Sequence, residues 1–125
     1  MKLCEAVTIV AYALTVSAGS AALAQNSPPT FQGDPDVYKV IFEDQNFRVI
    51  DATWAKGVHD KPHSHPVPSI IYSLDDCLIR VYAPDGKTRD IPNKAGTAMT
   101  VPITSSHIAE NIGGSDCRAI LVERK

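Results

Sequence analysis

The chain has 125 residues, with 12 lysines and arginines against 14 aspartates and glutamates, for a formal net charge of −2 at pH 7. The charges are interspersed and form no basic run, which excludes the usual electrostatic footprint of a protein that binds nucleic acid or an anionic membrane surface. The length leaves room for one domain of about one hundred residues after an N-terminal segment that we expect to be removed.

The N-terminal segment has the composition of a signal peptide. It begins Met1-Lys2, continues as a largely apolar stretch over 6–23, and ends in the small-x-small sequence Ala22-Leu23-Ala24. This pattern predicts cleavage after Ala24, so we expect 1–24 to be a signal peptide and the mature protein to be periplasmic or secreted. The alternative is a membrane anchor, which the Ala, Ser, Thr and Gly content of the stretch disfavours.

The next segment, 25–37, contains Pro28, Pro29 and Pro35 among short polar residues. Proline at this density prevents regular helix, so the segment is predicted to be a linker or an arm that lies on the fold. From 38 onward, short runs rich in Val, Ile, Thr and Tyr alternate with polar turns, which is typical of an all-β domain over 38–125. The expected strands are 38–43, 47–54, 70–74, 78–83, 97–101, 107–112 and 118–123.

Removal of the signal peptide would take Cys4 with it and leave Cys77 and Cys117. An exported protein resides where disulfides form and persist. Each of the two cysteines follows a predicted turn and opens a predicted strand. The sequence therefore leaves two possibilities open, a disulfide between them or two separate core residues.

Three of the four histidines fall where metal chemistry would need them. His63 and His65 are two residues apart, so on an extended strand both rings leave the same face and can chelate one ion. A His-x-His pair alone is weak evidence, because exposed pairs of this kind are common. The surrounding spacing adds to it.

Two blocks of the sequence resemble the two conserved motifs of the cupin superfamily. In the first, five residues separate Gly57 from the His63/His65 pair; in the second, Gly96, Pro102, His107 and Asn111 stand at the family's intervals. Thr104 replaces the middle glycine of the second motif. The resemblance covers almost the whole of 38–125 and implies a double-stranded β-helix, or jelly-roll barrel, in which His63, His65 and His107 bind one metal ion.

The sequence departs from the family at one ligand. Where the family has a glutamate, this chain has Ser69 or Ile70, and Asp76 at the place of a later turn glycine favours Ser69. The inferred site therefore has three neutral imidazoles and no acid. Such a site suits Zn, Fe, Ni, Cu or Co rather than Mg or Ca, and leaves positions open for water or a small-molecule ligand. The ion would keep its full charge of +2 and attract anionic chelators.

The resemblance implies a mononuclear metal-dependent enzyme of the oxygenase type, a dioxygenase acting on a small anionic or enolisable compound. Two alternatives stay open: a metal-dependent isomerase or lyase on a sugar or keto acid, and a non-catalytic binder of a metal or small ligand. His59, on the loop before the paired histidines, is the candidate proton shuttle.

Further residues are expected around the ion or in the cavity. Ser69 and Asn111 are predicted to support it from outside the ligand set, and Tyr72 and Trp54 to line or fill the cavity. The resemblance also implies a homodimer, because small cupins often pair through exposed sheet edges.

Overall fold

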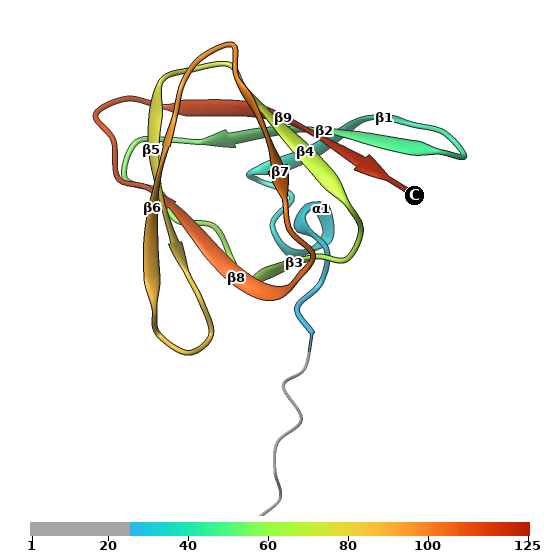
Figure 1. Ribbon diagram of the computed structural model, residues 1–125, viewed down its shortest axis with the longest axis horizontal. Coiled ribbons are helices and arrows are strands. Elements are labelled where there is room, and N and C mark those ends of the chain that lie inside the picture. Colours follow the sequence, from blue (N-terminus) through green and yellow to red (C-terminus); the bar gives the residue numbers. More distant parts are fainter. Residues whose placement is uncertain (1–25) are drawn as a thin grey trace, which may run out of the picture.

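The computed structural model describes residues 26–125, and in these the short apolar runs form nine β-strands and one short helix. The strands pack as two sheets that curve around a common interior (Figure 1). The helix is α1 (Thr30–Gly33), and the strands are β1 (Tyr38–Glu43), β2 (Phe47–Trp54), β3 (His63–His65), β4 (Ser69–Ser73), β5 (Cys77–Tyr82), β6 (Thr88–Asn93), β7 (Ala98–Val101), β8 (Thr104–Asn111) and β9 (Cys117–Arg124). The all-β prediction is confirmed.

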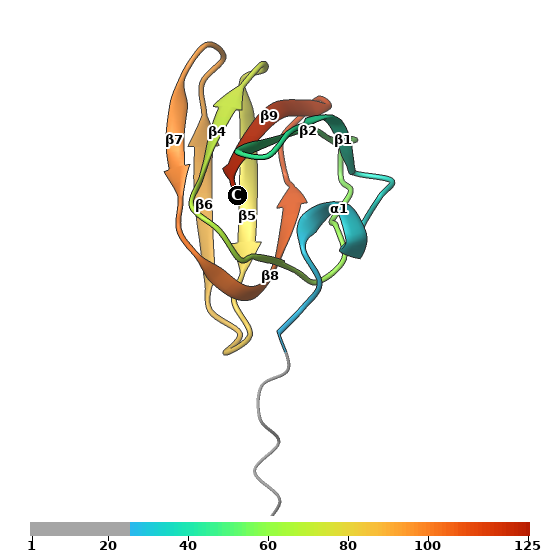
Figure 2. The same cartoon turned by 90° about the vertical axis from the view of Figure 1, so that its right-hand side faces the viewer.

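One sheet has five strands in the order β1-β2-β9-β4-β7, and the other has four in the order β3-β8-β5-β6. All of the pairings between these strands are antiparallel. In Figure 2, β4 and β7 of one sheet and β5 and β6 of the other lie together on the left, and α1 lies on the right. Side chains alternate inward and outward along each strand, so a buried interior and an outer surface arise from the same period-two pattern.

The core sits on the inner faces of both sheets. Its buried members are Val37, Tyr38, Ile50, Ala52, Trp54, Ile79, Ala109, Cys117, Ala119 and Leu121. Burying apolar side chains is worth about 25 cal/mol for each Å² removed from water, which makes this layer the main source of stability. Several core residues also face the cavity described below, so the core supports the site directly.

A disulfide joins the two sheets. Cys77 at the start of β5 bonds to Cys117 at the start of β9, with the Cα atoms 5.6 Å apart. The structure therefore resolves the two possibilities that the sequence left open, in favour of the disulfide.

Strand β6 (Thr88–Asn93) was not predicted. It contains Pro92, and its two charged residues, Arg89 and Asp90, are adjacent, so the sequence lacks the alternation expected of a strand. The structure explains its presence: β6 is the edge of the four-stranded sheet, where proline is tolerated, and all six of its residues pair with β5.

The proline-rich arm lies on the barrel, and the expectation that it holds no helix is wrong, because the four residues after Pro29 form the short helix α1. Backbone hydrogen bonds join it to the site: Ser64 N–H donates to the Pro28 carbonyl at 2.8 Å, and Ser27 N–H donates to the Ser105 carbonyl at 3.0 Å. Asp34 Oδ2 accepts the Lys61 N–H at 3.0 Å. The arm thus holds the segment that leads into β3. The predicted signal peptide lies outside the described residues. Within 26–125, no helix is long and apolar enough to cross a bilayer.

Candidate metal centre

The three predicted histidines come together on neighbouring strands. His63 on β3 pairs directly with His107 on β8, and a register shift between His63 and His65 brings the second ring of β3 into the same group. The loops before both blocks turn at glycines: Gly57 and Gly96 have φ of 76° and 79°, which only glycine adopts without strain. The spacing that marked these residues in the sequence therefore has a structural cause.

The rings meet through their Nε2 atoms. His107 Nε2 lies 2.8 Å from His63 Nε2 and 3.2 Å from His65 Nε2. Around an ion with metal–nitrogen bonds of about 2.0–2.1 Å, adjacent ligands are about 2.9 Å apart in octahedral and about 3.3 Å apart in tetrahedral geometry. The observed separations match a shared ion. They do not suit a hydrogen-bonded triad, because a neutral ring carries one proton and can direct it to one neighbour.

Protonation favours the same assignment. Burial lowers the pKa of His65 to about 3, helped by repulsion from His107 and His63. Burial and His63 lower the pKa of His107 to about 4, and Arg89 contributes in the same direction. Both rings are therefore neutral at neutral pH, with lone pairs available, and the neutral imidazole is the form that binds metal.

A buried carboxylate that sequence reasoning missed supports His63. Asp60 is fully buried in the loop before β3; its Oδ2 accepts the Tyr38 hydroxyl at 2.6 Å and the Trp54 indole N–H at 3.0 Å. Its Oδ1 accepts the Ala109 N–H at 2.7 Å and lies 3.5 Å from His63 Nδ1. Asp60 thereby ties β1, β2 and β8 to the loop that carries the metal-binding pair.

These contacts set the orientation of the His63 ring. His63 Nδ1 lies 3.0 Å from the Lys61 carbonyl, to which it donates its proton, so Nε2 keeps its lone pair. The Tyr38 hydroxyl lies 3.3 Å from His63 Nε2, but this hydroxyl donates its only hydrogen bond to Asp60. Burial and the Asp60 charge raise the pKa of Tyr38 well above its usual value, so it stays a neutral phenol.

Asp60 remains ionised despite its burial. Burial alone would raise its pKa, but the contact with His63, the Tyr38 hydroxyl and the Ala109 N–H outweigh burial and lower the pKa below the ordinary value. A negative charge behind the His63 ring strengthens that ring as a ligand without entering the coordination sphere. Among the described residues, only the three histidines group closely enough to share an ion, so no carboxylate completes the set.

Comparison with solved structures identifies the architecture. The chain is similar to a cupin domain from Bordetella pertussis, with a TM-score of 0.66 and 16% identity over 78% of this chain and 96% of that one. The chain has the cupin fold. It is also similar to an RmlC-like cupin with a double-stranded β-helix fold from Methanocaldococcus jannaschii, with a TM-score of 0.58 and 12% identity over 70% of this chain and 78% of that one.

A third similar structure is an RmlC-like cupin from Desulfovibrio desulfuricans, with a TM-score of 0.53 and 19% identity over 74% of this chain and 86% of that one. At such identities the likeness concerns the fold. No protein-family model and no curated protein sequence matches the chain. The cupin resemblance read from the two motifs is thus confirmed for the fold and for the grouping of the three histidines.

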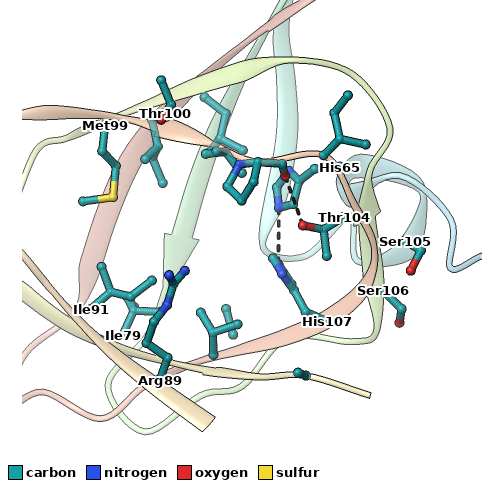
Figure 3. A pocket seen from close by; sticks show the side chains of 18 of the residues that line it. His65, Ile79, Arg89, Ile91, Met99, Thr100, Thr104, Ser105, Ser106 and His107 are labelled. Atoms are coloured by element: carbon teal, nitrogen blue, oxygen red, sulfur yellow. Dashed lines mark hydrogen bonds between the residues drawn. The ribbon is translucent and has the colours of Figure 1, made fainter. Parts of the chain in front are cut away.

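The cupin barrel holds a cavity of about 550 Å³ that is lined by His65 and His107, while His63 is fully buried and does not line it. Figure 3 shows His65 and His107 on one side of it and Ile79, Ile91 and Met99 on another. Tyr38, Trp54, Ala109 and Leu121 also line it, so core residues form part of its wall. The volume falls in the range of sites that hold small molecules.

Of the other predicted site residues, some are buried or line the cavity and others face outward. Ser69 is buried on β4, with its hydroxyl 3.5 Å from the Val67 carbonyl, and Trp54 lines the cavity. Tyr72 is 43% exposed and does not line the cavity, since the alternation along β4 turns it outward. His59 is exposed, outside the lining, with Nδ1 3.1 Å from the Asp60 carbonyl. The proton-shuttle role of His59 stays a prediction, and the exposed position of this residue outside the cavity lining does not support it.

Asn111 is fully buried but serves the turn rather than the histidines. Its Nδ2 donates to the Trp54 and Ser115 carbonyls at 3.0 and 2.8 Å, and its Oδ1 accepts the Gly113 N–H at 3.0 Å. These contacts fasten the end of β8 to the end of β2 and to the loop before β9. None of these hydrogen bonds reaches a histidine, so they do not support the predicted role of Asn111 beside the ion.

Proposed function

We propose that this protein binds one divalent transition-metal ion through His63, His65 and His107, and uses it to hold a small anionic or enolisable compound for an oxygenase-like reaction. The observation that carries the proposal is the convergence of three Nε2 atoms beside a cavity of about 550 Å³. When bound, such an ion would supply Lewis acidity and open positions for a chelating substrate and dioxygen.

The protein's own residues prepare the site in two ways. Asp60 and the Lys61 carbonyl fix the His63 ring, while Tyr38 and Trp54 hold Asp60 in place. Apolar side chains from β5, β6 and β7 exclude water from the space beside the rings, which strengthens the attraction between a cation and an anionic ligand.

The isomerase or lyase alternative receives less support. That chemistry needs a general acid or base within reach of the substrate, and no aspartate or glutamate occurs among the described residues that line the cavity. Tyr38 lines it, but its hydroxyl already donates its one hydrogen bond to Asp60. A non-catalytic binder would share every feature of the metal centre, so only turnover separates it from an enzyme.

A periplasmic or secreted location belongs to the same proposal. The Cys77–Cys117 disulfide supports it, because disulfides of this kind persist in oxidising compartments.

Metal analysis of untagged protein tests the proposal. We expect about one ion per chain in the wild type and in His59→Ala, and a loss of metal affinity of at least about 100-fold in His107→Ala with the β-sheet circular dichroism unchanged. Full metal retention by His107→Ala would remove this residue from the ligand set.

Oxygen uptake by the same preparations, with panels of dicarbonyl, thiol and hydroxybenzoate compounds, separates the functions. Iron with oxygen consumption supports the oxygenase. Zinc with turnover but no oxygen use would indicate an isomerase or lyase, and tight ligand retention without turnover would indicate a binder.

A further inference from the structure

The cavity has a marked charge bias. Its lining includes Lys87 and Arg89 and, within the described residues, no aspartate or glutamate, although the whole chain carries 14 acids and a net charge of −2. The acids are therefore excluded from this one surface. A metal ion held by three neutral imidazoles would add two further positive charges. A cavity of this kind favours an anionic occupant.

Arg89 is the cation placed to contact such an occupant. It lies on β6, where the residues that share its parity, Ile91 and Asn93, also line the cavity. Figure 3 shows its side chain pointing into the cavity, with His65 and His107 across from it. Both cations are exposed, but Lys87 is the weaker candidate because its ammonium group lies 3.7 Å from Asp85.

Arg89 is also left without a carboxylate partner. Arg48, Arg80 and Arg118 each form an ion pair, at 2.6–3.0 Å, whereas among the described residues Arg89 and the exposed Arg124 at the end of β9 form none. No carboxylate within residues 26–125 lies within 4.0 Å of Arg89.

Strand register explains the difference between Arg80 and Arg89. In the β5–β6 ladder, Arg80 is opposite Asp90, and Arg89 is opposite Val81. Side chains of neighbouring residues leave opposite faces of a strand, so Asp90 pairs with Arg80 on the outer face and cannot neutralise Arg89 on the inner one.

The space between Arg89 and the histidines is apolar. Ile79, Ile91 and Met99 face it from β5, β6 and β7 (Figure 3). A ligand that fits has three parts: a group that binds the ion, an apolar body, and an anionic group for the guanidinium. A carboxylate suits the last position best, because guanidinium and carboxylate form two parallel hydrogen bonds.

We propose that Arg89 selects the ligand of this cavity by binding a carboxylate remote from the metal-binding end, so that the substrate class is small apolar chelators that carry a second, anionic group. This inference rests on the proposed metal-dependent function and deepens it. Arg89 acts as a specificity residue and does not hold the ion.

The test compares acids with their methyl esters. Zinc-loaded protein is titrated calorimetrically with 3,4-dihydroxybenzoate, 3,4-dihydroxyphenylacetate and the methyl ester of each; the catechol can bind the ion in all four, and only the acids offer a carboxylate. We expect the wild type to bind at least one acid about 10-fold or more tightly than its ester. Arg89→Gln should abolish that preference, and Arg89→Lys should keep part of it, because lysine retains the charge but not the planar fork.

Arg80→Gln is the matched control, since it removes an arginine from the outer face of the adjacent strand and should leave the preference unchanged. No preference for the acid in either pair, or a preference that survives in Arg89→Gln, would overturn the proposal.

Repeating the titrations with metal-stripped protein separates this inference from the metal site. If the stripped wild type fails to bind zinc when the metal is added back, yet still shows the Arg89-dependent preference for acids, the role of Arg89 is supported and the metal-dependent function is contradicted. If the protein binds one zinc per chain but shows no preference for the acids, the metal site is supported and the role of Arg89 is contradicted.

Discussion

Asp60 shows how a residue outside the ligand set can determine a metal centre. Its carboxylate accepts hydrogen bonds from a hydroxyl, an indole N–H and a backbone N–H, and lies 3.5 Å from His63 Nδ1. Because the partners come from β1, β2 and β8, Asp60 couples the folding of the barrel to the orientation of one ring.

Asp60→Asn should weaken both metal binding and stability. The amide has only one oxygen to accept three donors, so at least one buried donor loses its partner, at a cost of about 1–3 kcal/mol in the free energy of unfolding. Loss of the charge behind His63 should lower metal affinity by about 10–100-fold. Zinc competition with a chromophoric chelator and urea denaturation would measure the two effects.

Asp36→Asn provides the control, because Asp36 is exposed. If Asp60→Asn binds zinc and unfolds as the wild type does, Asp60 is not a support of the site.

For individual residues, the sequence predicted site positions only where a regular spacing marked them. His63, His65 and His107 could be predicted because a period of two and two motif intervals mark them. Asp60 could not, because an aspartate in an irregular loop has no periodicity that distinguishes burial from exposure. Tyr72 shows the complementary difficulty: only the strand register decides which of two neighbouring residues faces the interior.

At the scale of elements, prediction succeeded for strands whose apolar pattern reflects burial and failed for β6. Most of β6 is exposed, so burial imposes little pattern on it, and Pro92 argues against a strand unless the edge position is known. The unpredicted strand is also the one that carries Arg89. The anionic ligand was expected from the charge of the ion alone, and the arginine that could recognise it came only from the structure.

The disulfide is the strongest link between two elements of opposite sheets. It closes a sequence separation of 40 residues, for which the chain-entropy model gives about 4 kcal/mol. The Cys77→Ser/Cys117→Ser variant should therefore lose up to about 4 kcal/mol in urea denaturation. Wild-type protein treated with a reductant should match the variant; equal stability of oxidised wild type and variant would show that the link contributes nothing.

At the scale of the whole molecule, the outer face of the five-stranded sheet carries an exposed apolar patch. Ile70 and Tyr72 are 45% and 43% exposed on β4, and Val122 and Ile120 lie opposite them on β9. Exposed apolar surface that is contiguous across strands is typical of an interface. We expect two copies of the chain to pair through this face.

Light scattering during size-exclusion chromatography tests this expectation. The wild type should elute as a dimer and Ile70→Lys as a monomer, because a charge at the centre of a paired apolar face is costly to desolvate. Arg80→Lys, on the other sheet, should remain dimeric. A monomeric wild type would contradict the expected assembly and leave the metal centre unaffected.

We propose that the imidazoles of two distant stretches of chain share one ion without a carboxylate. X-ray diffraction from crystals of the metal-loaded protein, recorded at the absorption edge of the bound metal, tests it most directly. If the three rings share the ion, one anomalous peak per chain will lie about 2.0–2.2 Å from Nε2 of each of His63, His65 and His107. A peak elsewhere, or an aspartate or glutamate oxygen bonded to the ion, would contradict it.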